Sequence, residues 1–211
     1  SLSEDQQREL KHGYYAAVSF IDAQIGRLLK MLDELGLADN TIVVLWSDHG
    51  WKLGEHNGWC KQTNFEIDTR VPLLIRDPRA GGNGKVSTSL VELVDLYPTL
   101  CDLTSIPVPS FVEGKSLAPI LDDVSIQNKQ IALSQFPRRS NGMSLMGYAL
   151  RSQRYRYVAW VNRDNGKVVE RELYDHAVDP EENQNIAADA ENADRLSRLH
   201  EQLCQAVPRL A

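Results

Sequence analysis

The sequence predicts an α/β fold in its first part, followed by a small antiparallel sheet and a terminal helix. Over residues 14–35 apolar side chains recur at steps of three and four, the period of an amphipathic helix. The run TIVVLW at 41–46 follows after a short polar turn and is apolar throughout, as in a buried strand. From residue 130 several short segments have the pattern of strands, and over residues 154–157 charged and aromatic residues alternate, which is typical of a half-exposed antiparallel sheet.

The remaining elements follow in order. Gly36 ends the first helix, and residues 71–75 form a second buried strand. Because a helix that leads into a buried strand is half of a β-α-β unit, we expect a parallel sheet covered on both faces. The other predicted segments are a loop at 77–87, a helix at 88–104, an irregular stretch at 105–119, strands at 131–136, 146–152, 155–161 and 172–174, and a helix at 189–205. This change of texture divides the chain into two parts, 1–120 and 121–211.

Composition excludes several classes of protein. The 211 residues are 42% hydrophobic and 25% charged, as in ordinary globular proteins. A net charge of −6 argues against a general nucleic-acid binder. No apolar run approaches the ~18 residues of a membrane-spanning helix. Three cysteines cannot form a complete disulfide framework. The first residues lack the pattern of a signal peptide, and we expect the chain to be cut from a longer protein.

The candidate site lies directly after the first predicted strand. Ligands of open α/β sheets bind beyond the carboxyl ends of the strands, and Asp48 and His49 stand at such an end. An oxygen and a nitrogen donor side by side could bind one divalent cation. The alternative is that Asp48 caps a turn and His49 is a packed loop histidine.

The loop that follows contains further candidates. A long loop without regular structure is often functional, and this one carries His56 and Lys61. Lys61 could hold an anionic oxygen of a substrate or assist a leaving group, or it could be a solvated surface lysine. Trp51 either packs the loop or forms a pocket wall. The sequence has no Gly-rich phosphate loop and no GxSxG motif, so the residues alone offer half of a metal site and no nucleophile.

Six segments in the same order give the chain a resemblance to the sulfatase family of the alkaline-phosphatase superfamily. The central one is TIVVLWSDHGWKLGEHNGWCKQTNFE followed by TRVPLLI, and the helix YYAAVSFIDAQIGRLLKMLDELGL precedes it. VDLYPTLCDLTSI, SQFPR, MGYALRSQRYRYVAWV and ELYDHAVDPEENQNIA follow. The set is most similar to the iduronate type of sulfatase. The resemblance implies that the chain is the C-terminal part of an alkaline-phosphatase-like sulfatase fold.

The resemblance also implies roles for individual residues. Asp48 and His49 fall on two Ca²⁺ ligands of the family, and Lys61 on the lysine that contacts the sulfate ester. His56 lies in a matching Gly-Glu-His segment and is expected to be catalytic with Lys61, and Trp51 matches a tryptophan near the site and is expected to contact the substrate. The family's other ligands and its formylglycine nucleophile lie upstream of the matching region and have no counterpart in this chain.

The expected function is hydrolysis of sulfate esters of a sulfated uronic acid or polysaccharide, whose carboxylate Arg138 could meet. We expect this chain alone to be inactive and to need the N-terminal part of the same protein. A phosphatase, phosphodiesterase or phosphonate hydrolase of the superfamily is one alternative, and a non-catalytic binding or assembly module is another. The family suggests a periplasmic, secreted or lysosomal location. We expect neither nucleic acid nor membrane as a partner, and a homo-oligomer formed through an exposed sheet edge.

Overall fold

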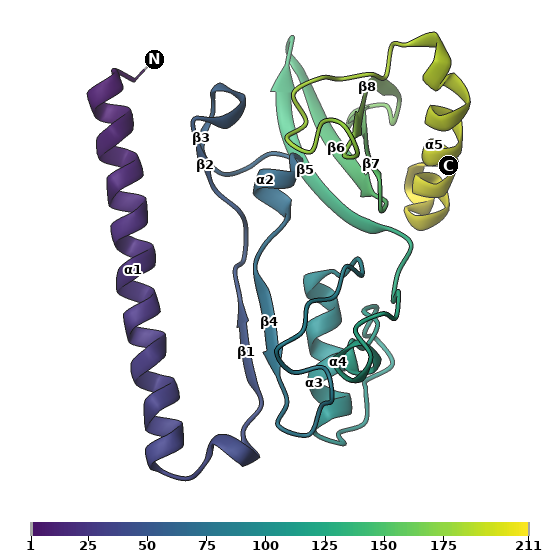
Figure 1. The fold of residues 1–211 in the computed structure, drawn as a ribbon. Coiled ribbons are helices and arrows are strands. Elements are labelled where there is room, and N and C mark those ends of the chain that lie inside the picture. The colour runs from purple at the N-terminus through teal and green to yellow at the C-terminus, as the bar shows by residue number, and fades with distance from the viewer. Residues whose placement is uncertain (1, 211) are drawn as a thin grey trace.

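The computed structural model describes residues 2–210, apart from the side chain of Arg209. A long helix, α1, stands beside a two-stranded sheet, and a four-stranded sheet with the terminal helix lies at the far side (Figure 1). Among the described residues no helix has the length and apolar character needed to cross a membrane.

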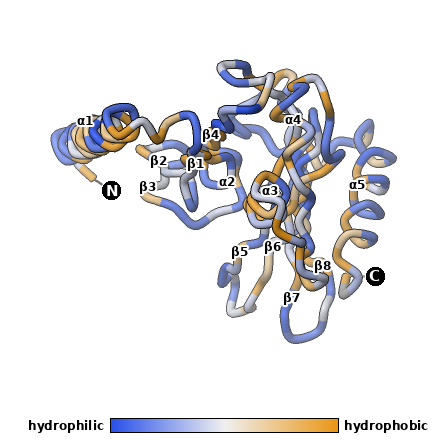
Figure 2. The backbone as a smooth tube through the Cα atoms, turned by 90° about the horizontal axis from the view of Figure 1, so that it is seen from below, coloured by the Kyte–Doolittle hydropathy of each residue, from blue (hydrophilic) through white to orange (hydrophobic). Residues whose placement is uncertain are grey.

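Helix α1 runs from Glu4 to Glu34, so it begins ten residues before the periodic segment. Ser3 starts it with a capping box, in which its hydroxyl accepts from the Gln6 amide and the Gln6 side chain accepts from the Ser3 amide. Gly36, at φ +66°, follows its end. None of its residues is buried. The predicted helix is therefore confirmed. Its apolar stripe is not covered by the described residues, and Figure 2 shows helix α1 standing apart from the four-stranded sheet.

The first two predicted strands do not by themselves form the expected parallel sheet. β1 (Val43–Trp46) and β4 (Leu73–Arg76) pair antiparallel, with Trp46 opposite Leu73. The connection between them contains no crossover helix, which a parallel return requires. A parallel partner in a β-α-β unit would precede α1, and residues 2–210 contain no strand there. The strands are also more exposed than predicted, because the described chain supplies no layer over Leu45, Trp46 or Leu74.

The connection between β1 and β4 holds four short elements, one of which is a 3-10 turn (Glu55–Asn57). β2 (Lys52–Leu53) and β3 (Trp59–Cys60) form a small antiparallel hairpin, and α2 (Glu66–Thr69) is a single helical turn. Within the predicted helix at 88–104, only Leu93–Asp95, a 3-10 turn, and α3 (Leu96–Leu103) are helical. The helix starts late because the Glu92 amide donates to the Asp95 carboxylate (2.9 Å) and caps it there. α4 (Ala118–Asp122) ends the irregular stretch.

The predicted C-terminal sheet and helix are confirmed, and the strands are longer than predicted. The expected half-exposure is wrong for the strand that begins at Tyr155, because residues 156–162 are all buried between the terminal helix on one face and the first part of the chain on the other. The sheet has the order β5-β6-β7-β8 and is antiparallel throughout. Its strands are β5 (Ala132–Ser140), β6 (Met143–Arg151), β7 (Tyr155–Asn162) and β8 (Val168–Asp175). A 3-10 turn (Ala190–Asn192) leads into α5 (Ala193–Ala206), which packs on the sheet and completes the core around Leu150, Tyr157, Leu173, Leu199 and Leu203.

A buried ion cluster fixes α2 to this sheet. The Arg156 guanidinium on β7 donates to both Glu66 and Glu182, and Arg151 on β6 donates to Glu66 from 3.1 Å. Glu182 also accepts from the Glu66 amide (2.7 Å) and contacts His176 Nε2 (2.7 Å). Burial alone would raise the pKa of Glu66, but Arg156 and Arg151 outweigh it and hold that pKa below its ordinary value. Glu66 therefore stays ionised, and its ion pairs hold α2 against the sheet.

We predict that Arg156→Met destabilises the chain by about 3–5 kcal/mol, because it leaves buried carboxylates without their partner. The Arg156 side chain is 3% exposed. Arg8→Met is the matched control, since the Arg8 side chain is 74% exposed and pairs only with residues of its own helix. Urea unfolding at neutral pH measures both. A loss of less than about 1 kcal/mol for Arg156→Met would contradict the prediction.

The same cluster predicts an acid dependence. A carboxyl whose pKa is lowered by folding stabilises the folded state above its unfolded pKa and loses that contribution as the pH falls through the folded value. For Glu66 the loss therefore begins below its ordinary value of 4.5. Urea midpoints measured from neutral pH downward should fall less steeply in this window for Glu66→Gln than for the wild-type chain. Equal slopes would contradict the assignment.

Candidate functional site

The start of the site loop is held against α2 by a backbone contact. The Gly50 amide donates to the Asp68 carbonyl (2.8 Å). A Cβ on Gly50 would lie 1.8 Å from the Ile67 carbonyl oxygen, so only glycine allows this approach. Gly50 follows His49, and the position of the histidine therefore depends on that of α2.

A buried ion pair holds the next part of the loop. Lys52 Nζ donates to the Asp68 carboxylate, and Thr63 donates to the same oxygen. The side chains of Lys52 and Asp68 are 4% and 3% exposed. Gly58 gives the lysine room, because a Cβ there would lie 2.7 Å from Lys52 Cε. Lys52 thus ties the hairpin β2–β3 to α2, at a depth where an unpaired charge would be costly.

The structure brings together four of the residues predicted from the sequence. Asp48 and His49 directly follow the carboxyl end of β1, as predicted. Lys61 Nζ lies 2.6 Å from His49 Nε2, although twelve residues separate them in the sequence. The Asp48 carboxylate lies 3.5 Å from the same nitrogen and is 81% exposed. Trp51 stacks on the His49 ring, with centroids 6.2 Å apart. The result is a compact polar site at the end of a strand.

The hydrogen bonds fix the tautomer of His49. Its Nδ1 lies 2.8 Å from the Gly50 carbonyl oxygen, which can only accept, so Nδ1 carries the proton. Nε2 then has a free lone pair and accepts from the Lys61 ammonium. In this tautomer the ring presents Nε2 toward the Asp48 carboxylate and Lys61, and Nε2 is the atom through which this histidine could bind a metal ion.

An aromatic stack joins the site to α1. The Tyr14 ring stacks on Trp51, with centroids 6.1 Å apart and an interplanar angle of 25°, and Trp51 stacks on His49 at 26°. The sequence reasoning missed Tyr14 as a site residue, because it stands in the apolar pattern of a helix. Its distance in sequence from Trp51 gave no signal of the contact.

The two other predicted residues lie elsewhere. The His56 ring stacks on Phe65 at 3.8 Å, and among residues 2–210 no hydrogen bond or ion pair joins it to Asp48, His49 or Lys61. Arg138 lies on β5, where its guanidinium covers the Trp160 ring at 3.6 Å and pairs with the carboxylates of Glu170 and Glu172. Arg138 therefore belongs to a group of ion pairs on the sheet and not to the site near His49.

Asp48 offers the oxygen donor that a hard cation prefers and His49 a less usual nitrogen donor, and they fit such an ion only as part of a larger set. The Asp48 oxygen and His49 Nε2 are close enough to reach one ion, and the carboxylate is open to further ligands. Ca²⁺ takes six to eight ligands, so most of a calcium site would have to come from outside these residues. A second group of possible ligands, Glu66, His176 and Glu182, is less suitable because Arg156 already matches its charge.

Comparison with known proteins places the chain in a family. A family profile described as "N-sulphoglucosamine sulphohydrolase, C-terminal" matches residues 54–208, and one of a protein of unknown function matches residues 5–78. Iduronate 2-sulfatase of Homo sapiens is 34% identical over 92% of this chain and 47% of its own length. N-acetylglucosamine-6-O-sulfatase of Bacteroides thetaiotaomicron is 34% identical over 88% of this chain and 33% of its own. The chain spans about half the length of the iduronate sulfatases it matches.

Solved structures give the same result. BT4656, solved in complex with its substrate D-glucosamine-2-N,6-O-disulfate, superposes with a TM-score of 0.84 and 33% identity, over 93% of this chain and 40% of that one. A phosphonate monoester hydrolase of Agrobacterium radiobacter superposes with a TM-score of 0.86 and 26% identity, over 99% of this chain and 43% of that one. The predicted fold class and resemblance are confirmed, and the chain belongs to the sulfatases of the alkaline-phosphatase superfamily.

Proposed function

We propose that the protein to which this chain belongs hydrolyses sulfate esters of sugars, and that Asp48, His49 and Lys61 are part of its active site. The observation that carries the proposal is their meeting at the carboxyl end of β1, where Lys61 Nζ lies 2.6 Å from His49 Nε2. The likeness to enzymes named for sulfated sugars, among them iduronate 2-sulfatase and BT4656, supports the substrate class.

Each residue has a role suited to its chemistry. Lys61, an exposed ammonium on a flexible stem, donates to the ester oxygen and stabilises the negative charge that develops there. Asp48 and His49 Nε2 would supply two of the ligands of a calcium ion. When bound, that cation would polarise the sulfate oxygens. Trp51 forms a wall beside the site, braced by Tyr14.

We propose that the nucleophile, a formylglycine, and the remaining metal ligands come from a part of the protein not included in these 211 residues. The relatives are about twice as long as the chain. The uncovered apolar side chains of α1, such as Phe20 and Leu28, and those of β1 and β4 give such a part a surface to cover. The gene upstream of Ser1 tests this directly, since it should encode an Asp-Asp pair and a C/S-x-P-x-R motif.

Phosphonate ester hydrolysis is the second candidate, because a phosphonate monoester hydrolase superposes over 99% of the chain. The longer gene product should be assayed against sulfated saccharides and phosphonate monoesters side by side. A clear preference for the sulfate ester supports the proposal. A preference for the phosphonate, or no turnover of either ester by a protein that carries the upstream motif, would overturn it.

Calcium binding by the chain itself provides a readout that is independent of turnover. With only two protein donors, we predict that calorimetry gives a Kd weaker than micromolar and that Asp48→Asn abolishes the binding. Lys61→Met should tighten binding about fivefold, because it removes a positive charge beside the ion and frees His49 Nε2. The ¹⁵N shift of that nitrogen should report the ion. Lys85→Met, in an exposed loop, is the control. Micromolar binding by the wild-type chain, or weaker binding by Lys61→Met, would contradict the prediction.

Turnover by the longer protein tests the lysine. Lys61→Ala should lower kcat by roughly 10²–10³-fold, the effect of removing one donor to a developing anion. His56→Ala should lower thermal stability more than kcat, because the His56 ring packs on Phe65 and has no bond to the site. If His56→Ala costs as much kcat as Lys61→Ala without loss of stability, the histidine is catalytic as the sequence predicts.

A further inference from the structure

We propose that a pocket beside α2 binds a sulfate group, at a place distinct from the candidate active site. The pocket has a volume of about 370 Å³ and lies between the end of α2, strand β6 and the segment after β8. Its ionisable lining residues are all basic: Arg70, Arg151, Arg154 and His176. Gln153, Ala177 and Pro180 complete the wall.

The arginines differ in how far their charges are already matched. Arg151 donates through Nε to Glu66 (3.1 Å) and through Nη1 to the Ser152 carbonyl, which leaves Nη2 unused. Arg154 holds Asp175 through Nε (2.7 Å) and Nη2 (2.6 Å), which leaves Nη1 unused. Arg70 is exposed, and among the described residues its side chain has no hydrogen bond or ion pair. Within residues 2–210, the pocket therefore retains one unmatched positive charge and several N–H donors for which no carbonyl or carboxylate partner is seen.

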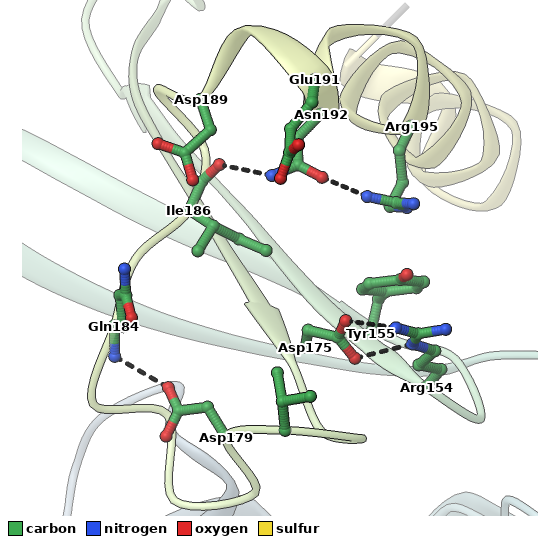
Figure 3. A pocket seen from close by; sticks show the side chains of 11 residues that line it. Arg154, Tyr155, Asp175, Asp179, Gln184, Ile186, Asp189, Glu191, Asn192 and Arg195 are labelled. Atoms are coloured by element: carbon green, nitrogen blue, oxygen red, sulfur yellow. Dashed lines mark hydrogen bonds and ion pairs between the residues drawn. The ribbon is translucent and has the colours of Figure 1, made fainter.

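A neighbouring pocket lacks the excess of basic residues that marks the pocket beside α2. It has a volume of about 360 Å³, and Arg154 lines it as well (Figure 3). There, however, Arg154 and Arg195 face four carboxylates, which belong to Asp175, Asp179, Asp189 and Glu191. An anion would be repelled from that side. The two pockets share one arginine but have opposite preferences.

Sulfate suits the basic pocket because guanidinium groups bind tetrahedral oxyanions through paired N–H donors. The arginines are also held in place: Arg151 and Arg154 keep their carboxylate partners while their outer N–H groups remain free, so little order is lost on binding. The sulfate group has two sources, free inorganic sulfate or a sulfate carried on a saccharide. The saccharide source rests on the proposed function, whereas binding of inorganic sulfate does not.

Solution NMR of the 211-residue chain tests the proposal, with the Nε–H resonances of Arg151 and Arg154 as reporters. Sodium sulfate should shift both in a saturable manner, and sodium chloride at the same ionic strength should not. Arg70→Gln should weaken sulfate binding by about tenfold, the loss of one charge-assisted contact. Since Arg70 has no partner, this variant should fold normally. Arg163→Gln, an equal change of charge on the exposed turn after β7, should leave affinity within about twofold.

A second arm distinguishes the sources. A sulfated heparin disaccharide and its desulfated form are titrated separately. Tighter binding of the sulfated sugar than of inorganic sulfate assigns the pocket to a saccharide, and equal or weaker binding assigns it to the free anion. Equal shifts in chloride, or equal weakening by Arg163→Gln and Arg70→Gln, would overturn the proposal. Because no turnover is measured, the pocket stands or falls independently of the catalytic assay.

Discussion

The docking of α2 onto the C-terminal sheet is the interaction on which the site depends. Four residues are too few to form a stable helix by themselves, so tertiary contacts must hold Glu66–Thr69 in this conformation. Arg156 supplies the main one, because it bonds Glu66 and Thr69 together with Glu182. A buried guanidinium shared by two carboxylates is rigid in direction as well as strong, since its N–H groups lie in one plane. The sheet thereby fixes both the place and the orientation of α2.

Helix α2 positions the candidate site through two contacts with the loop that carries it. The carbonyl of Asp68 holds the Gly50 amide, and the Gly50 carbonyl in turn fixes the His49 ring in the tautomer whose Nε2 accepts from Lys61. The side chain of Asp68 meanwhile holds Lys52 and the hairpin that leads to Lys61. A sheet that contributes no residue to the polar site thus determines the distance between its two nitrogen atoms. This explains why the second half of the chain is needed beside a site built from the first half.

Local patterns in the sequence predicted most of the elements and named the residues of the candidate site, but not the contacts that join them. Asp48 and His49 could be placed because a strand end is a local feature, and Lys61 because a long loop is one. The role of Arg156 was invisible, since its pairing with Glu66 spans 90 residues and alternation of charge with aromatic residues indicates only a half-exposed strand. The antiparallel pairing of β1 with β4 was missed for the same reason. Pairing depends on how the intervening chain returns, which apolar runs do not encode.

The uncovered helix α1 is joined to the candidate site by a stack of three aromatic rings, Tyr14, Trp51 and His49. Tyr14 belongs to α1, the helix whose apolar stripe is uncovered, and it braces Trp51 against His49. Any polypeptide that covers α1 and the open strands would therefore lie beside the site. On the proposed function, the further ligands and the nucleophile would then arrive with the same polypeptide that buries the apolar surface. Burial of that surface supplies the free energy, so assembly of the fold and completion of the active site are expected to be a single cooperative step.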